Sequence, residues 1–154
     1  PGIDGPNVIS GLSAMLDCRQ AGDRVVVIGG GEVGVEAGIH LAKTGRQVTV
    51  LEMRDKLAAD STIMHFRSMF KAYWEGVPTV PGVTPEGVRY LDAAGAEQFL
   101  PADTVVVSTG MTPLREQALD FYGSAGRFYL IGDCKKPGTI QTTNRNVYAT
   151  CMAI

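Results

Sequence analysis

Apolar residues along the chain fall into short blocks whose spacing predicts an α/β fold. Residues 25–28 and 105–108 are uninterrupted runs rich in β-branched side chains, as expected of strands buried on both faces of a parallel sheet. After residue 31 the apolar positions recur at helical spacing, and a second apolar run follows at residues 48–51. The order strand, glycine turn, helix and strand predicts a βαβ unit of the Rossmann type.

The other elements are predicted from the same two periodicities. We expect helices over residues 7–20, 62–75 and 143–154, a hairpin of residues 87–91 and 97–100, and a strand over 126–131. Residues 76–85 carry three prolines and are expected to form a broken, extended segment. The last predicted helix reaches the final residue without a stop signal, which suggests a sequence cut from something longer.

The turn after the first strand has the spacing G-x-G-x-x-G, formed by Gly29, Gly31 and Gly34. Gly29 permits a tight turn, Gly31 lets a pyrophosphate approach the backbone, and Gly34 lets the helix lie close to the strand. Free N–H groups at the helix start favour phosphate binding. The predicted phosphate contacts are Gly29, Gly30, Gly31, Glu32, Val33 and Gly34, with the Glu32 side chain pointing away from the ligand.

An acidic residue, Glu52, ends the second strand of the unit. Its distance from the glycine turn is close to the ~20 residues typical of the acid that binds the adenosine ribose. A carboxylate accepts hydrogen bonds from the ribose hydroxyls and repels a 2′-phosphate, so NADH is favoured over NADPH. Met53 and Arg54 follow directly and are also predicted cofactor contacts. Because Arg54 could reach a 2′-phosphate, NADPH stays open as an alternative.

Composition narrows the possibilities further. A chain of 154 residues with 45% hydrophobic residues suits one domain, and a net charge of −2 gives no indication of nucleic-acid binding. No apolar run approaches the ~20 residues that cross a membrane, and no signal peptide is visible. Cys18, Cys134 and Cys151 lack the C-x-x-C spacing of redox or metal sites, so we expect thiols in a reducing cytoplasm and no metal. His40 and His65 are isolated and interpreted as surface or helix-face residues, not as ligands.

The motifs GGGEVGVE, LEM, ADTVVVSTGMTP and FYLIGDC, taken in this order, resemble the pyridine nucleotide–disulfide oxidoreductase superfamily. The closer resemblance is to flavin-dependent reductases related to 2,4-dienoyl-CoA reductase, enoate reductase and trimethylamine dehydrogenase. It implies a flavin-binding barrel followed by an FAD domain that carries an inserted NAD(P)-binding domain. It also implies that Gly132 and Asp133 contact FAD, with Asp133 on the ribityl chain, and that Glu36 lies beside the nicotinamide. The nicotinamide itself is expected to extend toward Gly110, where the strand end opens the crevice. Glu36 has an alternative interpretation as an exposed helix residue, and the Gly132–Asp133 pair as a strand-ending turn.

This sequence departs from that family pattern in ways that predict its organisation. It has one glycine fingerprint, and neither the barrel nor the iron–sulfur cysteines of these relatives. We therefore expect a leading loop and helix at 1–22, an NAD(P)-binding Rossmann-like domain at 23–111, and a partial return segment of an FAD-binding domain at 112–154. The missing barrel and the first half of the FAD domain would be its partners, with no nucleic acid and no membrane. The segment alone is expected neither to retain FAD nor to turn over substrate, because no residue is a credible catalytic group.

The predicted function is therefore an NADH-binding module that passes hydride to FAD in the full-length protein. Two alternatives remain open at this stage. A structural module that binds only ADP would use the same glycines and Glu52. A protein-interaction domain with a vestigial fingerprint would instead bind no nucleotide and expose an apolar patch around Phe121, Tyr122, Val147 and Ile154.

Overall fold

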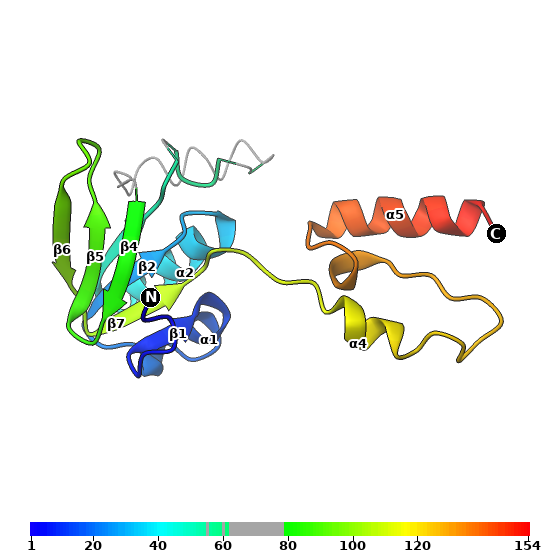
Figure 1. The fold of residues 1–154 in the computed structure, drawn as a ribbon, viewed down its shortest axis with the longest axis horizontal. Coiled ribbons are helices and arrows are strands. Elements are labelled where there is room, and N and C mark those ends of the chain that lie inside the picture. The colour runs from blue at the N-terminus through cyan, green and yellow to red at the C-terminus, as the bar shows by residue number, and fades with distance from the viewer. Residues whose placement is uncertain (55, 60, 62–78) are drawn as a thin grey trace. The chain divides into compact units, whose positions relative to one another are not determined.

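The computed structural model describes residues 1–54, 56–59, 61 and 79–154 (Figure 1). The chain divides into two compact units, Pro1–Gly110 and Met111–Ile154, each of which is described here by itself. The helix predicted at 62–75, with His65, and the first residues of the extended segment at 76–85 lie outside the described residues.

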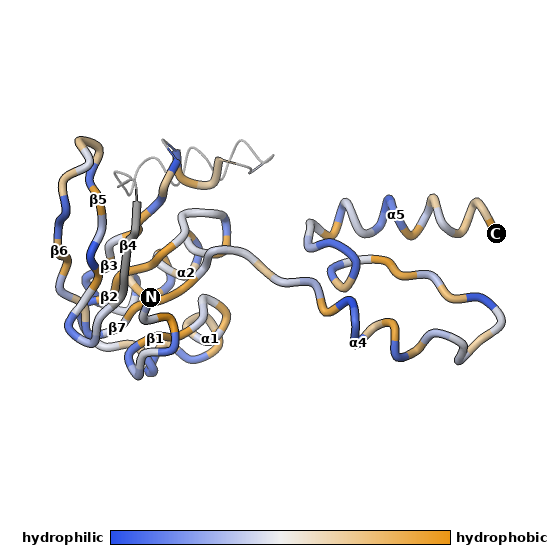
Figure 2. The backbone as a smooth tube through the Cα atoms, in the orientation of Figure 1, coloured by the Kyte–Doolittle hydropathy of each residue, from blue (hydrophilic) through white to orange (hydrophobic). Residues whose placement is uncertain are grey.

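A four-stranded parallel sheet forms the centre of the first unit, in the order β1-β7-β2-β3. Its strands are β1 (Val8–Ser10), β2 (Arg24–Ile28), β3 (Gln47–Leu51) and β7 (Thr104–Val107). In β2 the side chains of Val25, Val26 and Val27 are all buried, as expected of an unbroken apolar run in a strand covered on both faces. Figure 2 shows hydrophobic colour in the central sheet. The predicted α/β fold with a parallel sheet is thus confirmed.

Apolar residues pack on both faces of the parallel sheet in this unit. Helix α2 (Glu32–Lys43) connects β2 to β3, and its Leu41 packs with Val25 and Val27 on one face of the sheet. Val26, on the other face, packs with Val88 of the antiparallel sheet. The helix stops at Thr44, followed by Gly45 with φ +90°, a backbone conformation that favours glycine and matches the predicted stop.

The prediction of one helix over residues 7–20 is wrong. The structure instead has β1, a short helix α1 (Gly11–Leu16) and a 3-10 turn (Cys18–Gln20). Val8 pairs with Val105 in parallel register, and Ser10 caps α1 by accepting a hydrogen bond from the Ser13 N–H at 3.0 Å. Pairing with β7 therefore overrides the helical periodicity of this segment.

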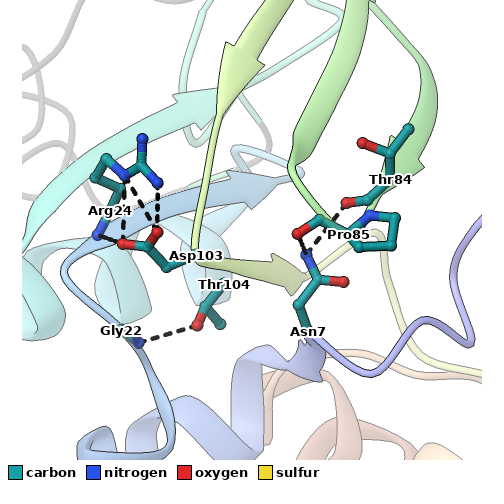
Figure 3. A network of polar contacts seen from close by, with 7 residues as sticks. All are labelled: Asn7, Gly22, Arg24, Thr84, Pro85, Asp103 and Thr104. Carbon is teal, nitrogen blue, oxygen red and sulfur yellow. Dashed lines mark hydrogen bonds and ion pairs between the residues drawn. The ribbon is translucent and has the colours of Figure 1, made fainter.

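A three-stranded antiparallel sheet comprises β4 (Thr79–Thr84), β5 (Gly87–Leu91) and β6 (Glu97–Pro101). The predicted hairpin is confirmed as β5–β6, and the described part of the segment at 76–85 forms β4 with irregular register between Thr79 and Gly82. Asp92 holds the hairpin turn because its Oδ1 accepts the N–H groups of Ala94 and Ala96, both at 2.9 Å. The Asn7 side chain joins the two sheets by donating to the Thr84 carbonyl at 3.2 Å (Figure 3).

The second unit contains α4 (Arg115–Leu119), a 3-10 turn (Gly132–Cys134) and α5 (Ile140–Met152). The predicted C-terminal helix is confirmed, with an earlier start where Thr139 accepts a hydrogen bond from the Thr142 N–H. The strand predicted at 126–131 is wrong, because no strand of this unit lies beside it to supply hydrogen-bond partners. No residue in the fully described segment 111–154 is buried.

Candidate dinucleotide-binding site

The glycine turn leaves the parallel sheet at the point where the strand order reverses. From β2 the chain passes through α2 to β3 on one side, whereas β7 pairs with β2 on the other. The Gly29 N–H donates to the Leu51 carbonyl at 2.9 Å, and the Ser108 N–H donates to the Ile28 carbonyl at 2.8 Å. The turn is therefore anchored to both neighbouring strands, at the position where open α/β sheets bind ligands.

Steric contacts in the structure explain why two positions of the fingerprint are glycine. Gly29 has φ +99°, and a Cβ on it would lie 2.5 Å from the Ser108 carbonyl oxygen. A Cβ on Gly34 would collide with the Gly29 carbonyl oxygen and lie 3.2 Å from the Ser108 Cβ. Gly29 thus allows the turn and Gly34 allows α2 to approach it, with Ser108 as the shared neighbour.

Gly31 differs from both because the space beside it is open. It is exposed, its φ of −67° is ordinary, and a Cβ built on it would meet nothing within 4 Å. It is also the N-cap of the twelve-residue helix α2 and provides no side-chain cap hydrogen bond. The first N–H groups of α2 therefore lie beside open space, and free N–H groups at a helix start favour phosphate binding.

The Glu52 carboxylate lies against this turn in a fixed orientation. Its Oε2 accepts the Gly30 N–H at 2.7 Å, and its Oε1 accepts the Arg54 N–H at 2.9 Å. The residue is half-buried, and each carboxylate oxygen can accept one further hydrogen bond. The geometry fits a diol such as the ribose of an adenine nucleotide.

The segment after Glu52 also contacts the glycine turn, which the sequence did not predict. The Ala58 N–H donates to the Gly30 carbonyl at 2.7 Å, and the Leu57 side chain lies where a Cβ of residue 30 would project. Ala58 is fully buried, has φ 48° and packs against Val35 of α2. Neither Leu57 nor Ala58 belongs to a periodic pattern, so no sequence signal identified them.

The remaining predicted residues of the first unit lie around this centre. Glu32 and Glu36 are half-buried on the first two turns of α2, whereas Val33 is 46% exposed. Beyond the strand ends lie three exposed residues of the predicted site, Met53, Arg54 and Gly110, and Gly110 has φ +119°. The outward direction of the Glu32 side chain and the nicotinamide contacts of Glu36 and Gly110 stay predictions.

Gly132 and Asp133 belong to the second unit and form its 3-10 turn. Gly132 has φ +70°, and Asp133 Oδ1 accepts the Gly138 N–H at 3.1 Å. A shallow cavity of about 280 Å³ lies beside this turn and the start of α5, with Thr139 and Thr143 in its lining. Asp133 is exposed and holds the turn, and its contact with FAD stays a prediction.

Polar contacts, which Figure 3 shows, hold the amino-terminal ends of β2 and β7 together. The Asp103 carboxylate accepts the Arg24 backbone N–H at 2.9 Å and pairs with its guanidinium. The hydrogen bond from that guanidinium is the main reason that the pKa of Asp103 lies below its ordinary value. The buried Thr104 hydroxyl accepts the Gly22 N–H at 2.9 Å. These contacts fix where β2 and β7 begin.

Three other properties of the described residues bear on the site. No helix in these ranges has both the length and the hydropathy needed to cross a bilayer. The same residues contain no group of three or more His, Cys, Asp or Glu side chains placed to hold a metal ion. Cys18, Cys134 and Cys151 are free thiols.

Comparisons with known proteins place this geometry in a family. The family model described as pyridine nucleotide-disulphide oxidoreductase matches residues 5–150. A metal reductase of Desulforamulus reducens is 26% identical over 94% of this chain and 27% of its own length. A bilirubin reductase of Mediterraneibacter gnavus is 34% identical over 88% of this chain and 22% of its own length.

A solved structure of a 2-naphthoyl-CoA reductase complex shares 30% sequence identity and a TM-score of 0.79, covering 96% of this chain and 23% of that chain. This chain spans about a quarter of the length of these relatives. The relatives named here are all reductases, and the glycine turn, Glu52 and the parallel sheet occur within the matched region. The chain belongs to the pyridine nucleotide-disulphide oxidoreductase family.

Proposed function

We propose that the unit Pro1–Gly110 is the NADH-binding module of a flavin-dependent oxidoreductase. The observation that carries this proposal is the Glu52 carboxylate, held 2.7 Å from the Gly30 N–H beside the open backbone of Gly31. This pair offers a negative acceptor for a ribose diol and, next to it, helix N–H groups for a pyrophosphate. An unmodified 2′-hydroxyl donates to Glu52, whereas a 2′-phosphate is repelled by it.

The chain's own residues bind and orient the cofactor in this proposal. The pyrophosphate lies over the N–H groups from Gly31 to Gly34, the adenosine ribose lies on Glu52, and the nicotinamide extends toward Gly110. When bound, the nicotinamide supplies a hydride for the flavin of the full-length protein. Glu36, on the second turn of α2, lies on the path from the phosphates to the nicotinamide. No acid–base role is assigned to any residue.

We further propose that the full-length protein resembles the flavin-dependent reductases related to 2,4-dienoyl-CoA reductase. The likeness to the 2-naphthoyl-CoA reductase structure supports this, as does a cinnamate reductase of Clostridium sporogenes that is 25% identical over 84% of this chain. Its partners would be a flavin-binding barrel and the first half of an FAD domain, which Asp133 would help to complete. We also propose a cytoplasmic location, which the free thiols support because the cytoplasm keeps cysteines reduced.

A structural module that binds only ADP is the second candidate, because the geometry of Gly31 and Glu52 supports it as well as it supports NADH binding. The two positions with the best-defined geometry, Gly31 and Glu52, both contact the ADP half of a dinucleotide in this arrangement. An ADP module would need nothing else from the site. The nicotinamide half therefore decides between the candidates.

Calorimetric titration of the chain with NADH, NADPH and ADP tests the proposal. We expect NADH to bind more tightly than either, and Glu52→Gln to weaken NADH binding about tenfold, since it removes a hydrogen bond to a charged group. Glu97→Gln is the matched control, because Glu97 pairs with Arg89 in the hairpin away from the site. Equal binding of ADP and NADH would support the ADP module, whereas binding of none of the three would overturn nucleotide recognition.

A further inference from the structure

Gly30 uses both of its backbone polar groups inside the protein. Its N–H donates to Glu52 Oε2 at 2.7 Å, and its carbonyl accepts the Ala58 N–H at 2.7 Å. The residue is buried, unlike the exposed Gly31 that follows it. Its N–H is therefore committed to the carboxylate and is not available to a phosphate.

The absence of a side chain at Gly30 serves the same carboxylate. A Cβ on Gly30 would collide with the Leu57 side chain, and it would lie 2.9 Å from the Glu52 Cβ and 3.1 Å from its Oε2. Real Cβ atoms essentially never approach another atom more closely than 3.0 Å, so Glu52 or the turn must shift. Space for Glu52 is thus a reason for glycine at this position that differs from the reasons at Gly29 and Gly34.

We propose that Gly30 is a positioning residue that sets the preference for NADH over NADPH by holding Glu52. This inference rests on the proposed function, because it concerns the ribose end of the same site. The Gly30 N–H fixes one carboxylate oxygen and the Arg54 N–H fixes the other at 2.9 Å. The two remaining acceptor positions then meet a ribose diol in one orientation, and the charge stays where a 2′-phosphate would lie.

The test compares Gly30→Ala with Gly31→Ala by titrating NADH and NADPH into each variant. We expect Gly30→Ala to reduce the ratio of the NADPH to the NADH dissociation constant about tenfold, the effect of losing one hydrogen bond to a charged group. Gly31→Ala changes the phosphate approach shared by both cofactors and should weaken both equally, leaving the ratio unchanged. A merely structural role of Gly30 would likewise lower both affinities without changing the ratio.

A double-mutant cycle shows whether Gly30 acts through Glu52. In the Glu52→Gln background the discriminating charge is gone, so adding Gly30→Ala should leave the ratio within about twofold. Circular dichroism checks that each variant folds. If Gly30→Ala does not fold, the double variant Gly30→Ala/Leu57→Ala takes its place in the test, because it removes the nearest clash. An unchanged ratio in a folded Gly30 variant would overturn this inference alone. Failure of the unsubstituted chain to bind either cofactor would overturn the proposed function and this inference with it.

Discussion

The close approach of α2 to the glycine turn makes Gly34→Ala an informative perturbation. A methyl group at residue 34 would collide with the Gly29 carbonyl oxygen, and it would lie 3.0 Å from the carbonyl carbon. Carbon atoms in favourable contact are about 3.5–4.0 Å apart, so the start of α2 must withdraw by on the order of 1 Å. The colliding atoms are backbone atoms, which cannot move aside by a change of rotamer.

Two opposing effects determine the change in the free energy of unfolding. Overpacking a well-packed contact costs typically about 1–3 kcal/mol, and we expect the upper end here because the neighbours are rigid. Alanine is favoured over glycine within a helix by about 1 kcal/mol, which offsets part of that cost. The net expectation is a destabilisation of about 2 kcal/mol, a large fraction of the 5–15 kcal/mol typical of a domain.

Urea denaturation followed by circular dichroism measures this change, with Gly31→Ala as the control. Residue 31 is an exposed N-cap with open space around it, so alanine there should cost at most about 1 kcal/mol. Gly31→Ala should nevertheless weaken NADH binding, because its methyl group occupies the space left for the pyrophosphate. If Gly34→Ala were as stable as the unsubstituted chain, the packing of α2 on Gly29 would not be as the structure has it.

Three further predictions follow from other parts of the molecule. Arg24 lowers the pKa of Asp103 below its ordinary value of 3.8, so the pair stabilises the fold above that pH and this contribution is lost as the pH falls. Asp103→Asn should therefore reduce the drop in melting temperature between about pH 5 and pH 2. Thr104→Val leaves the Gly22 N–H without its acceptor and should cost about 1–2 kcal/mol in urea denaturation, and no change would refute that role. Residues 111–154, none of them buried, should exchange amide hydrogens faster than β2 and β7, and equal protection in mass spectrometry would contradict this.

The elements that the sequence predicted well are those whose pattern is local. The buried valines of β2, the helical spacing of α2 and the turn residues around Asp92 each constrain their own segment. The errors arose where a distant partner decides the structure. Val8 enters a strand because Val105 lies beside it, and residues 126–131 form no strand because their own unit contains no strand to pair with them.

The candidate site shows the same division between local and distant determinants. The steric reasons expected of Gly29 and Gly34 are visible in the structure, since both follow from the spacing of the turn itself. The hydrogen bond between Gly30 and Glu52 could not be predicted, because spacing does not reveal which backbone N–H meets a carboxylate. Contact with a nucleotide stays a prediction for Gly29, Gly34 and Glu52, whereas the Gly30 N–H already donates to the carboxylate.

Three of the four glycines of the turn have different reasons within the fold for lacking a side chain. Gly29 has a positive φ, Gly34 lets α2 lie close to the turn, and Gly30 leaves space for Glu52. None of these constraints applies to Gly31. A glycine that folding does not require is best explained by something outside the fold, and the open space at Gly31 faces the helix N–H groups that attract anions. Selection for folding alone would tolerate alanine at Gly31, and for that reason this position separates ligand binding from stability.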